Sequence, residues 1–245
     1  MLKVMNFKKA VLLIHGFAGG NYDFGELIND LQTHKSLDIF TFTLPGHEKG
    51  RITKVTKEDW IQSAENQIEK IIKNGYKKIY IIGHSMGGIL AVHLACKYPQ
   101  IKKLVLAAPA YKHFMLKDNK LDIIEGIKKI PKIFKDFNYE EVMSRIMRIP
   151  TTAIKEFVSL ADAHLNDIKN ITIPTLILYG SNDNIVPIDS IDHVYDNIKS
   201  KSVTLIELDK LNHNIFTNDR YEETKKIIVN FLIGYNFSAK ERKKI

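Results

Sequence analysis

Short runs of apolar residues alternate with longer segments of helical periodicity along most of this 245-residue chain. The runs are rich in Val, Ile and Leu without polar alternation, which is typical of strands that are buried on both faces of a parallel sheet. They lie at 10–15, 38–43, 78–82, 103–107, 175–179 and 203–208, with helical patterns between them at 22–33, 57–73, 87–97, 189–198 and 219–231. This order predicts an α/β fold, with a mostly parallel sheet and helices on both faces.

One segment, residues 111–170, interrupts the alternation because it contains no strand-like run. It has amphipathic stretches broken by two prolines, at 121–130, 139–149 and 152–163 with Pro131 and Pro150. Because the insertion leaves the sheet at the carboxyl end of a strand, where open α/β sheets bind ligands, we expect a small helical cap over a site. The core would then comprise residues 1–110 and 171–245. The alternative is that the insertion only adds packing surface.

The formal charge of +8, from 36 Lys and Arg against 28 Asp and Glu, raises the question of a nucleic-acid or anionic-membrane partner. Residues 1–9 contribute +3 and residues 240–244 another +3, which leaves only +2 for residues 10–239. We interpret the ends as solvated basic tails on a nearly neutral body, and we expect no nucleic-acid partner.

Hydropathy and cysteine content bear on the compartment. No apolar run approaches the roughly 18 residues that span a bilayer, and residues 1–9 contain no apolar segment typical of a signal peptide, so we expect no membrane insertion. The single cysteine, Cys96, cannot form an internal disulfide, which fits a cytoplasmic location. Its helical apolar neighbours predict a buried, inert thiol.

The strongest local motif is Gly-His-Ser-Met-Gly-Gly at 83–88, directly after a predicted strand and directly before a predicted helix. A G-x-S-x-G turn holds its serine in a strained conformation, and the flanking glycines avoid clashes in the tight turn. Ser85 would then stand at a helix N-terminus, where the backbone N–H of Met86 and the helix dipole can stabilise an oxyanion. We predict that Ser85 is a nucleophile; the alternative is a glycine-rich packing turn.

A serine nucleophile needs a general base, and one known chain order for such sites is serine, then an acid, then histidine. Of the nine histidines, only His193 and His213 follow the predicted strand at 175–179. His193 falls within a helical pattern, whereas His213 lies in a loop after the strand at 203–208 and can reach the edge of the sheet. We predict that His213 is the base.

The candidate acid is Asp183, just past the strand at 175–179. A carboxylate at this strand end can reach the same rim as the serine and the histidine. Its rivals are Asp189 and Asp192, which belong to the following helix, and Asp209, which is so close to His213 in the chain that a turn role is favoured.

A second oxyanion donor is expected in the loop His-Gly-Phe-Ala-Gly-Gly at 15–20, after the first strand. Phe17 is the predicted donor through its main chain, with Phe17 and Met86 also lining the acyl-binding site; the alternative is that Phe17 is ordinary core. We expect His15 to brace the loop. His47, in another rim loop, has no partners at ligand spacing, so we predict neither a metal nor a cofactor.

Together, the motifs at 15–20, 83–88, 180–187 and Asn212-His213 resemble the α/β-hydrolase superfamily, and more closely the small bacterial carboxylesterases related to monoacylglycerol lipases. The similarity extends from about Ala10 to Ile233. It departs from the family at His84 and Met86, where Gly-x-Ser-Leu-Gly-Gly is frequent, and this departure leaves the triad intact.

The resemblance implies the α/β-hydrolase fold with a small helical cap, and a serine carboxylesterase that acts through an acyl-enzyme. The implied substrates are short- to medium-chain esters or monoacylglycerols, because apolar residues recur along the predicted cap segments. Alternatives are an acyl-thioesterase or acyltransferase with the same triad, and a non-catalytic small-molecule binding module.

Overall fold

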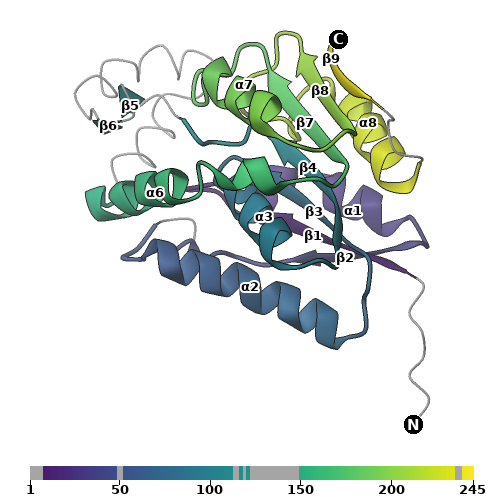
Figure 1. Ribbon diagram of the computed structural model, residues 1–245, viewed down its shortest axis with the longest axis horizontal. Coiled ribbons are helices and arrows are strands. Elements are labelled where there is room, and N and C mark those ends of the chain that lie inside the picture. Colours follow the sequence, from purple (N-terminus) through teal and green to yellow (C-terminus); the bar gives the residue numbers. More distant parts are fainter. Residues whose placement is uncertain (1–7, 49–51, 113–115, 118–119, 122–148, 235–238) are drawn as a thin grey trace.

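A seven-stranded parallel sheet organises the protein (Figure 1). The computed structural model describes residues 8–48, 52–112, 116–117, 120–121, 149–234 and 239–245. The strands are β1 (Lys9–Ile14), β2 (Leu37–Thr41), β3 (Ile79–His84), β4 (Ile101–Ala107), β7 (Thr175–Gly180), β8 (Val203–Leu208) and β9 (Lys240–Lys244), in the order β2-β1-β3-β4-β7-β8-β9. Every neighbouring pair is parallel. The predicted α/β fold is confirmed.

Helices cover both faces of this sheet (Figure 1). One face carries α2 (Lys57–Lys73), α3 (Met86–Lys97), α6 (Thr151–Ala163) and α7 (Ile188–Asn197), and the other carries α1 (Leu27–Gln32) and α8 (Tyr221–Ile233). Two 3-10 turns, η1 (Asn21–Phe24) and η3 (Asp167–Asn170), complete the ordered segments used below. All five predicted helical patterns outside the insertion form helices, and α2 has the predicted bounds.

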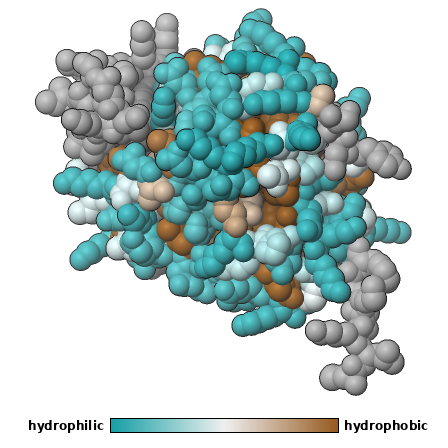
Figure 2. All heavy atoms as spheres, viewed as in Figure 1, coloured by the Kyte–Doolittle hydropathy of each residue, from teal (hydrophilic) through white to brown (hydrophobic). Residues whose placement is uncertain are grey.

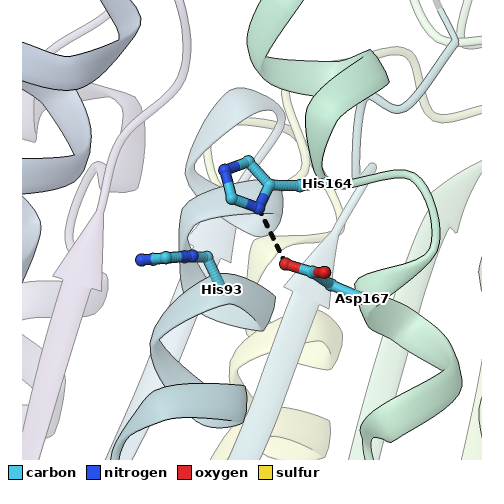
Figure 3. A group of neighbouring side chains, drawn as sticks. All are labelled: His93, His164 and Asp167. Atoms are coloured by element: carbon cyan, nitrogen blue, oxygen red, sulfur yellow. Dashed lines mark hydrogen bonds and ion pairs between the residues drawn. The ribbon is translucent and has the colours of Figure 1, made fainter.

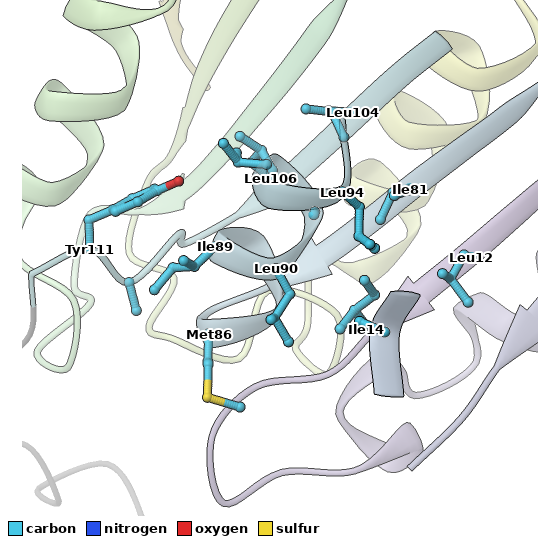
Figure 4. Packing of buried hydrophobic residues seen from close by; sticks show 14 of the residues in the cluster. Leu12, Ile14, Ile81, Met86, Ile89, Leu90, Leu94, Leu104, Leu106 and Tyr111 are labelled. Carbon is cyan, nitrogen blue, oxygen red and sulfur yellow. The ribbon is translucent and has the colours of Figure 1, made fainter. Parts of the chain in front are cut away.

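The core consists of two apolar layers, one on each face of the sheet. Along β1, for example, Leu12 and Ile14 enter the layer under α2 and α3, whereas Val11 and Leu13 enter the layer under α1 and α8. This alternation explains why the strand runs are apolar throughout. Figure 4 shows the first layer, where α3 packs its leucine and isoleucine side chains against the strands.

A capping box defines the start of α2. The Thr56 hydroxyl accepts a hydrogen bond from the Asp59 N–H at 3.2 Å, and the Asp59 carboxylate accepts one from the Thr56 N–H at 2.9 Å. Two otherwise unpaired backbone donors are thereby satisfied, which fixes where the helix begins. The helix carries Trp60, fully buried, on its inner face.

The C-terminal residues differ from the prediction, because Lys240–Lys244 are not a solvated tail but the edge strand β9, parallel to β8. Their positive charges meet acids from distant elements: Arg242 Nη1 lies 2.9 Å from Asp192 Oδ1, and Lys244 Nζ lies 3.2 Å from Glu207 Oε1. A strongly charged edge strand also discourages pairing with other chains.

The insertion was expected to be free of strands, and this is wrong at one point. Leu116–Lys117 (β5) and Lys120–Leu121 (β6) form a short antiparallel pair. The predicted helix at 152–163 is confirmed as α6. The other two predicted helical stretches lie, apart from Leu121 and Ile149, outside the described residues.

The outer surface is mostly hydrophilic in the view of Figure 2. Tyr22 and Ile233 are the exposed large hydrophobic side chains among the described residues. Among these described residues, no helix is both long enough and apolar enough to cross a membrane.

Candidate active site

Ser85 occupies a strained turn between β3 and α3. Its φ of 53° and ψ of −117° place it in a region that side chains other than glycine rarely adopt. A Cβ atom on Gly83 would lie 2.4 Å from the Gly87 carbonyl oxygen, and one on Gly87 would lie 2.0 Å from the Ile14 carbonyl oxygen. Both flanking positions therefore require glycine, as the motif predicts.

Backbone hydrogen bonds hold this turn in place. The Ser85 N–H donates to the Ala107 carbonyl at 2.9 Å, and the Ser85 carbonyl accepts from the N–H groups of Gly88 and Ala110 at 3.0 and 3.2 Å. The strain at Ser85 is thus supported by β4 and by the first turn of α3.

His213 and Asp183 form a buried hydrogen-bonded pair, with 2.7 Å between His213 Nδ1 and Asp183 Oδ2. The loop after β7 holds the acid, because Asp183 Oδ1 accepts hydrogen bonds from the N–H groups of Ile185 and Val186, both at 2.9 Å. The two loops also meet at Gly180, where a Cβ would lie 2.3 Å from the Leu211 carbonyl oxygen. The loop that carries Asp183 and the loop that carries His213 are therefore closely packed.

The electrostatics of this pair favour the protonated imidazole. Burial lowers the pKa of His213, but the charge of Asp183, its hydrogen bond and the charge of Asp23 together outweigh burial and raise this pKa above its ordinary value. Because Nδ1 donates to Asp183, Nε2 is the nitrogen of the neutral ring that can accept a proton.

His84 connects Ser85 to the His213 loop. Its Nε2–H donates to the His213 carbonyl at 3.0 Å, and its ring lies 4.8 Å from the His213 ring, centroid to centroid. The structure thus brings Ser85, Asp183 and His213 to the same carboxyl rim of the sheet. The rival residues have other places or partners. Asp189 and Asp192 belong to α7, Asp209 Oδ1 lies 3.1 Å from Lys244 Nζ, and His193 Nε2 donates to the Leu165 carbonyl at 2.8 Å.

The loop at 15–20 lies directly against Ser85, since a Cβ on Gly16 would be 3.0 Å from the Ser85 Cβ. The N–H groups of Phe17 and Met86 donate no backbone hydrogen bond within the described parts of the chain. These are the two predicted oxyanion donors, and the loop that carries Phe17 adjoins the Ser85 turn.

Two neutral histidines brace this loop. His15 Nε2 accepts from the Leu44 N–H at 3.0 Å, and His47 Nε2 accepts from the Ala18 N–H at 3.2 Å. Burial lowers the pKa of His15 to about 4 and also lowers the pKa of His47, which keeps both rings uncharged and able to accept. The expected bracing role of His15 is confirmed.

The Phe17 ring lies among aromatic side chains from two helices. It stacks on Phe157 of α6 at 5.0 Å and meets Trp60 of α2 edge-on at 5.9 Å. Met86 is fully buried, and Figure 4 shows its side chain extending from the start of α3. Phe17 thus belongs partly to the core, and it connects the predicted oxyanion loop with the insertion.

Sequence reasoning missed one residue of this region, Asp23. Its Oδ2 lies 3.8 Å from His84 Nδ1, and a Cβ on Gly19 would be 1.9 Å from the same oxygen. Burial raises the pKa of Asp23, but its interactions with His84 and His15 outweigh burial and lower it. Asp23 is therefore a second carboxylate whose negative charge raises the pKa of His213. It lies in η1, and no sequence motif marks this position.

Cys96 was predicted to be buried, and this is wrong, because the residue is exposed near the end of α3, with its Sγ 3.4 Å from the Asp167 carbonyl. Every residue from Met86 to Val92 is buried. Because this part of α3 has no polar face, its sequence does not show which side of the helix faces solvent. The thiol is nevertheless a poor nucleophile, because partial burial and the nearby charge of Asp167 raise its pKa to about 11.

The family model for the alpha/beta hydrolase fold matches residues 9–137, more than half of the chain. The chain belongs to this family. A second model of this kind, serine aminopeptidase S33, matches residues 125–220. Several relatives are named esterase or lipase, in agreement with the family that the motifs resemble.

Three relatives illustrate this similarity. A carboxylesterase of Bacillus subtilis is 24% identical, over 89% of this chain and 93% of its own length. Human monoacylglycerol lipase ABHD6 is 23% identical, over 96% of this chain and 79% of its own length. The crystal structure of a monoacylglycerol lipase from Paleococcus ferrophilus superimposes with a TM-score of 0.70 at 21% identity, over 91% of this chain and 93% of that one, which supports the fold.

Proposed function

We propose that this α/β-hydrolase is a serine carboxylesterase in which Ser85, His213 and Asp183 form the catalytic triad. The observation that supports this most is the buried 2.7 Å bond between His213 and Asp183 on the rim where Ser85 stands in its strained turn. Relatives named carboxylesterase and monoacylglycerol lipase support an ester as the substrate class.

The reaction begins when Ser85 Oγ attacks the ester carbonyl while His213 Nε2 accepts its proton. The N–H groups of Phe17 and Met86 bind the oxyanion of the tetrahedral intermediate. His213 then gives the proton to the leaving alcohol, which leaves an acyl group on Ser85. Water, activated by the same imidazole, hydrolyses this acyl-enzyme, and Asp183 stabilises the imidazolium in both halves.

The proposed division of the chain is a core of residues 1–110 and 171–245 with a cap insertion at 111–170. Contacts of α6 with the rim support it. Phe157 stacks on Phe17, and Glu156 Oε2 accepts a hydrogen bond from the Lys57 N–H at 3.0 Å. The predicted apolar cap side chains, at Met115, Leu116 and in 123–147, lie outside the side chains that the structure describes.

The proposed substrates are short- to medium-chain acyl esters or monoacylglycerols, with the Phe17 ring and Met86 beside the acyl group. The Phe17 ring is only partly buried, and its loop lies against Ser85 at Gly16, which supports an apolar surface beside the nucleophile. We expect kcat/KM to rise with acyl length and then to fall once the chain exceeds the site.

The test is a series of p-nitrophenyl esters from acetate to laurate, with Ser85→Ala as the variant and Ser63→Ala on α2 as the matched control. Ser85→Ala should lose at least about 10⁴-fold in kcat, and Ser63→Ala should match the unmodified enzyme. Unchanged hydrolysis in Ser85→Ala would contradict the proposal. Acyl-thioesters and added alcohols belong in the same series, and faster turnover of thioesters than of every oxygen ester would indicate the thioesterase alternative.

A further inference from the structure

Three side chains that the ester chemistry does not use converge between α3 and the end of α6: His93, His164 and Asp167 (Figure 3). One nitrogen from each imidazole and one carboxylate oxygen all lie within 4.8 Å of one another. His93 belongs to α3, His164 directly follows α6, and Asp167 begins η3. The fold thus brings the three groups together from two separate parts of the chain.

His93 is oriented by a carboxylate on its far nitrogen. Its Nε2 lies 2.8 Å from Glu65 Oε1 on α2, and Lys97 Nζ lies 2.7 Å from the other oxygen of Glu65. A neutral imidazole that donates from Nε2 has its lone pair on Nδ1, the nitrogen that a cation would bind. Carboxylates in this position are a recurrent feature of histidine metal ligands, because they fix the ring and raise its basicity.

His164 and Asp167 supply the other two ligand atoms. His164 Nδ1 lies 2.7 Å from Asp167 Oδ2, so the two groups share one proton that a divalent cation can replace. The side chains of His93, His164 and Asp167 are 18%, 13% and 28% exposed, which admits a cation and a completing water molecule.

The donor set selects the class of cation. Two imidazole nitrogens and one carboxylate oxygen suit Zn²⁺ and similar transition metals, whereas Mg²⁺ and Ca²⁺ prefer oxygen ligands throughout. Zinc–ligand bonds of about 2.0–2.1 Å in a tetrahedral site place the ligand atoms about 3.3 Å apart. The His164 and Asp167 atoms, 2.7 Å apart, would therefore separate slightly, and the His93 nitrogen would move closer to them. Rotation of partly exposed side chains is sufficient for this movement.

We propose that His93, His164 and Asp167 form a structural site for Zn²⁺ or a related divalent transition metal, which fastens the end of α6 to α3. The expected consequence is for stability, because the three ligands lie on two separate segments of the chain, α3 and the end of α6 with η3. A cation bound only by the folded chain stabilises it. The proposal does not depend on the nature of the substrate.

The test uses the full chain after removal of metals with a chelator and dialysis. Titration calorimetry with ZnCl₂ should show one ion per chain, and saturating Zn²⁺ should raise Tm by several degrees. His93→Gln and Asp167→Asn, on the two different segments, should each weaken binding at least tenfold and abolish the Tm shift. Glu65→Gln should weaken binding by about 10- to 100-fold.

Two control variants separate this site from unspecific binding. His34→Gln removes a partly exposed histidine elsewhere, and Cys96→Ser removes the nearby thiol, whose Sγ lies 3.4 Å from the Asp167 carbonyl; both should bind Zn²⁺ as the unmodified chain does. Circular dichroism and ester hydrolysis verify that each variant folds. Absence of binding to the unmodified chain, equal binding by His93→Gln and Asp167→Asn, loss of binding in Cys96→Ser, or displacement of Zn²⁺ by a hundredfold excess of Mg²⁺ would overturn the proposal.

Discussion

Two histidine–carboxylate pairs in this protein share one geometry but lie in different surroundings. His213 Nδ1 to Asp183 Oδ2 and His164 Nδ1 to Asp167 Oδ2 both measure 2.7 Å. The Asp183 side chain is 0% exposed, whereas the Asp167 side chain is 28% exposed. The nitrogen–oxygen distance alone therefore does not distinguish a pair suited to proton transfer from a pair suited to metal binding.

The surroundings make the difference. Two backbone N–H groups fix Asp183, and the His213 loop is bonded to His84, the neighbour of the strained Ser85. The His164 pair faces a third potential ligand, His93, and Ser159 of α6 is bonded to Lys57 at 2.7 Å rather than to this pair. In this fold, backbone constraints at the strand ends build the first pair, and the packing of helices builds the second.

The largest expected difference between the pairs concerns the acids. Asp183→Asn should reduce kcat for p-nitrophenyl butyrate by about 10⁴-fold, because the amide favours the wrong imidazole tautomer and no longer stabilises the imidazolium. Asp167→Asn should leave kcat unchanged. Steady-state kinetics on both variants provide the measurement, and equal losses in the two would remove the distinction between the pairs.

The second prediction concerns pH. Neutral His213 is the proposed base, so kcat/KM should fall about tenfold per pH unit on the acid side, with a midpoint above the ordinary histidine value of about 6.5. The raised pKa also means that this group stabilises the fold below its unfolded pKa, and that this contribution is lost as pH rises through the folded pKa. His164→Gln should leave the activity profile unmoved; a midpoint below 6.5 in the unmodified enzyme would contradict the assignment.

A smaller effect is expected from Asp23, whose charge contributes to the raised pKa of His213. Asp23→Asn should move the midpoint of the kcat/KM profile toward acid by less than about one pH unit. Asp38→Asn is the control, because Asp38 pairs with Lys8 at 2.8 Å, outside the site. A midpoint that moves toward alkaline pH would show that Asp23 does not act on His213 in this way.

The smallest effect concerns stability. Because the pair is partly exposed, Asp167→Asn should lower the free energy of unfolding by no more than about 1 kcal/mol. Urea denaturation with chelator present measures this without any bound metal. A loss of several kcal/mol under these conditions would indicate that the pair itself, rather than a cation, holds α6 to α3.

The sequence predicted six of the seven strands and led to the proposed triad because both rest on local signals. Buried strands such as 175–179 are apolar on both faces, and the polar residue that follows each strand end lies on the rim whatever the details of packing. The glycines beside Ser85 are required by backbone clashes of 2.4 and 2.0 Å, which a motif encodes directly.

The features that escaped prediction depend on contacts between distant segments. β9 consists of charged residues and is recognisable only beside β8 and its acidic partners. Asp23 lies near His84 only after folding. His93 and His164 each have ordinary helical neighbours, and the cluster with Asp167 exists because α3 packs against α6 and η3.

The central claim is that Ser85 is the nucleophile, and covalent labelling tests it most directly. The folded, active enzyme is incubated with a fluorophosphonate and analysed by intact mass and peptide mapping. The account predicts one adduct per chain, on Ser85, loss of hydrolysis in proportion to labelling, and no adduct in Ser85→Ala. An adduct on another residue, or full hydrolytic activity with Ser85 blocked, would contradict it.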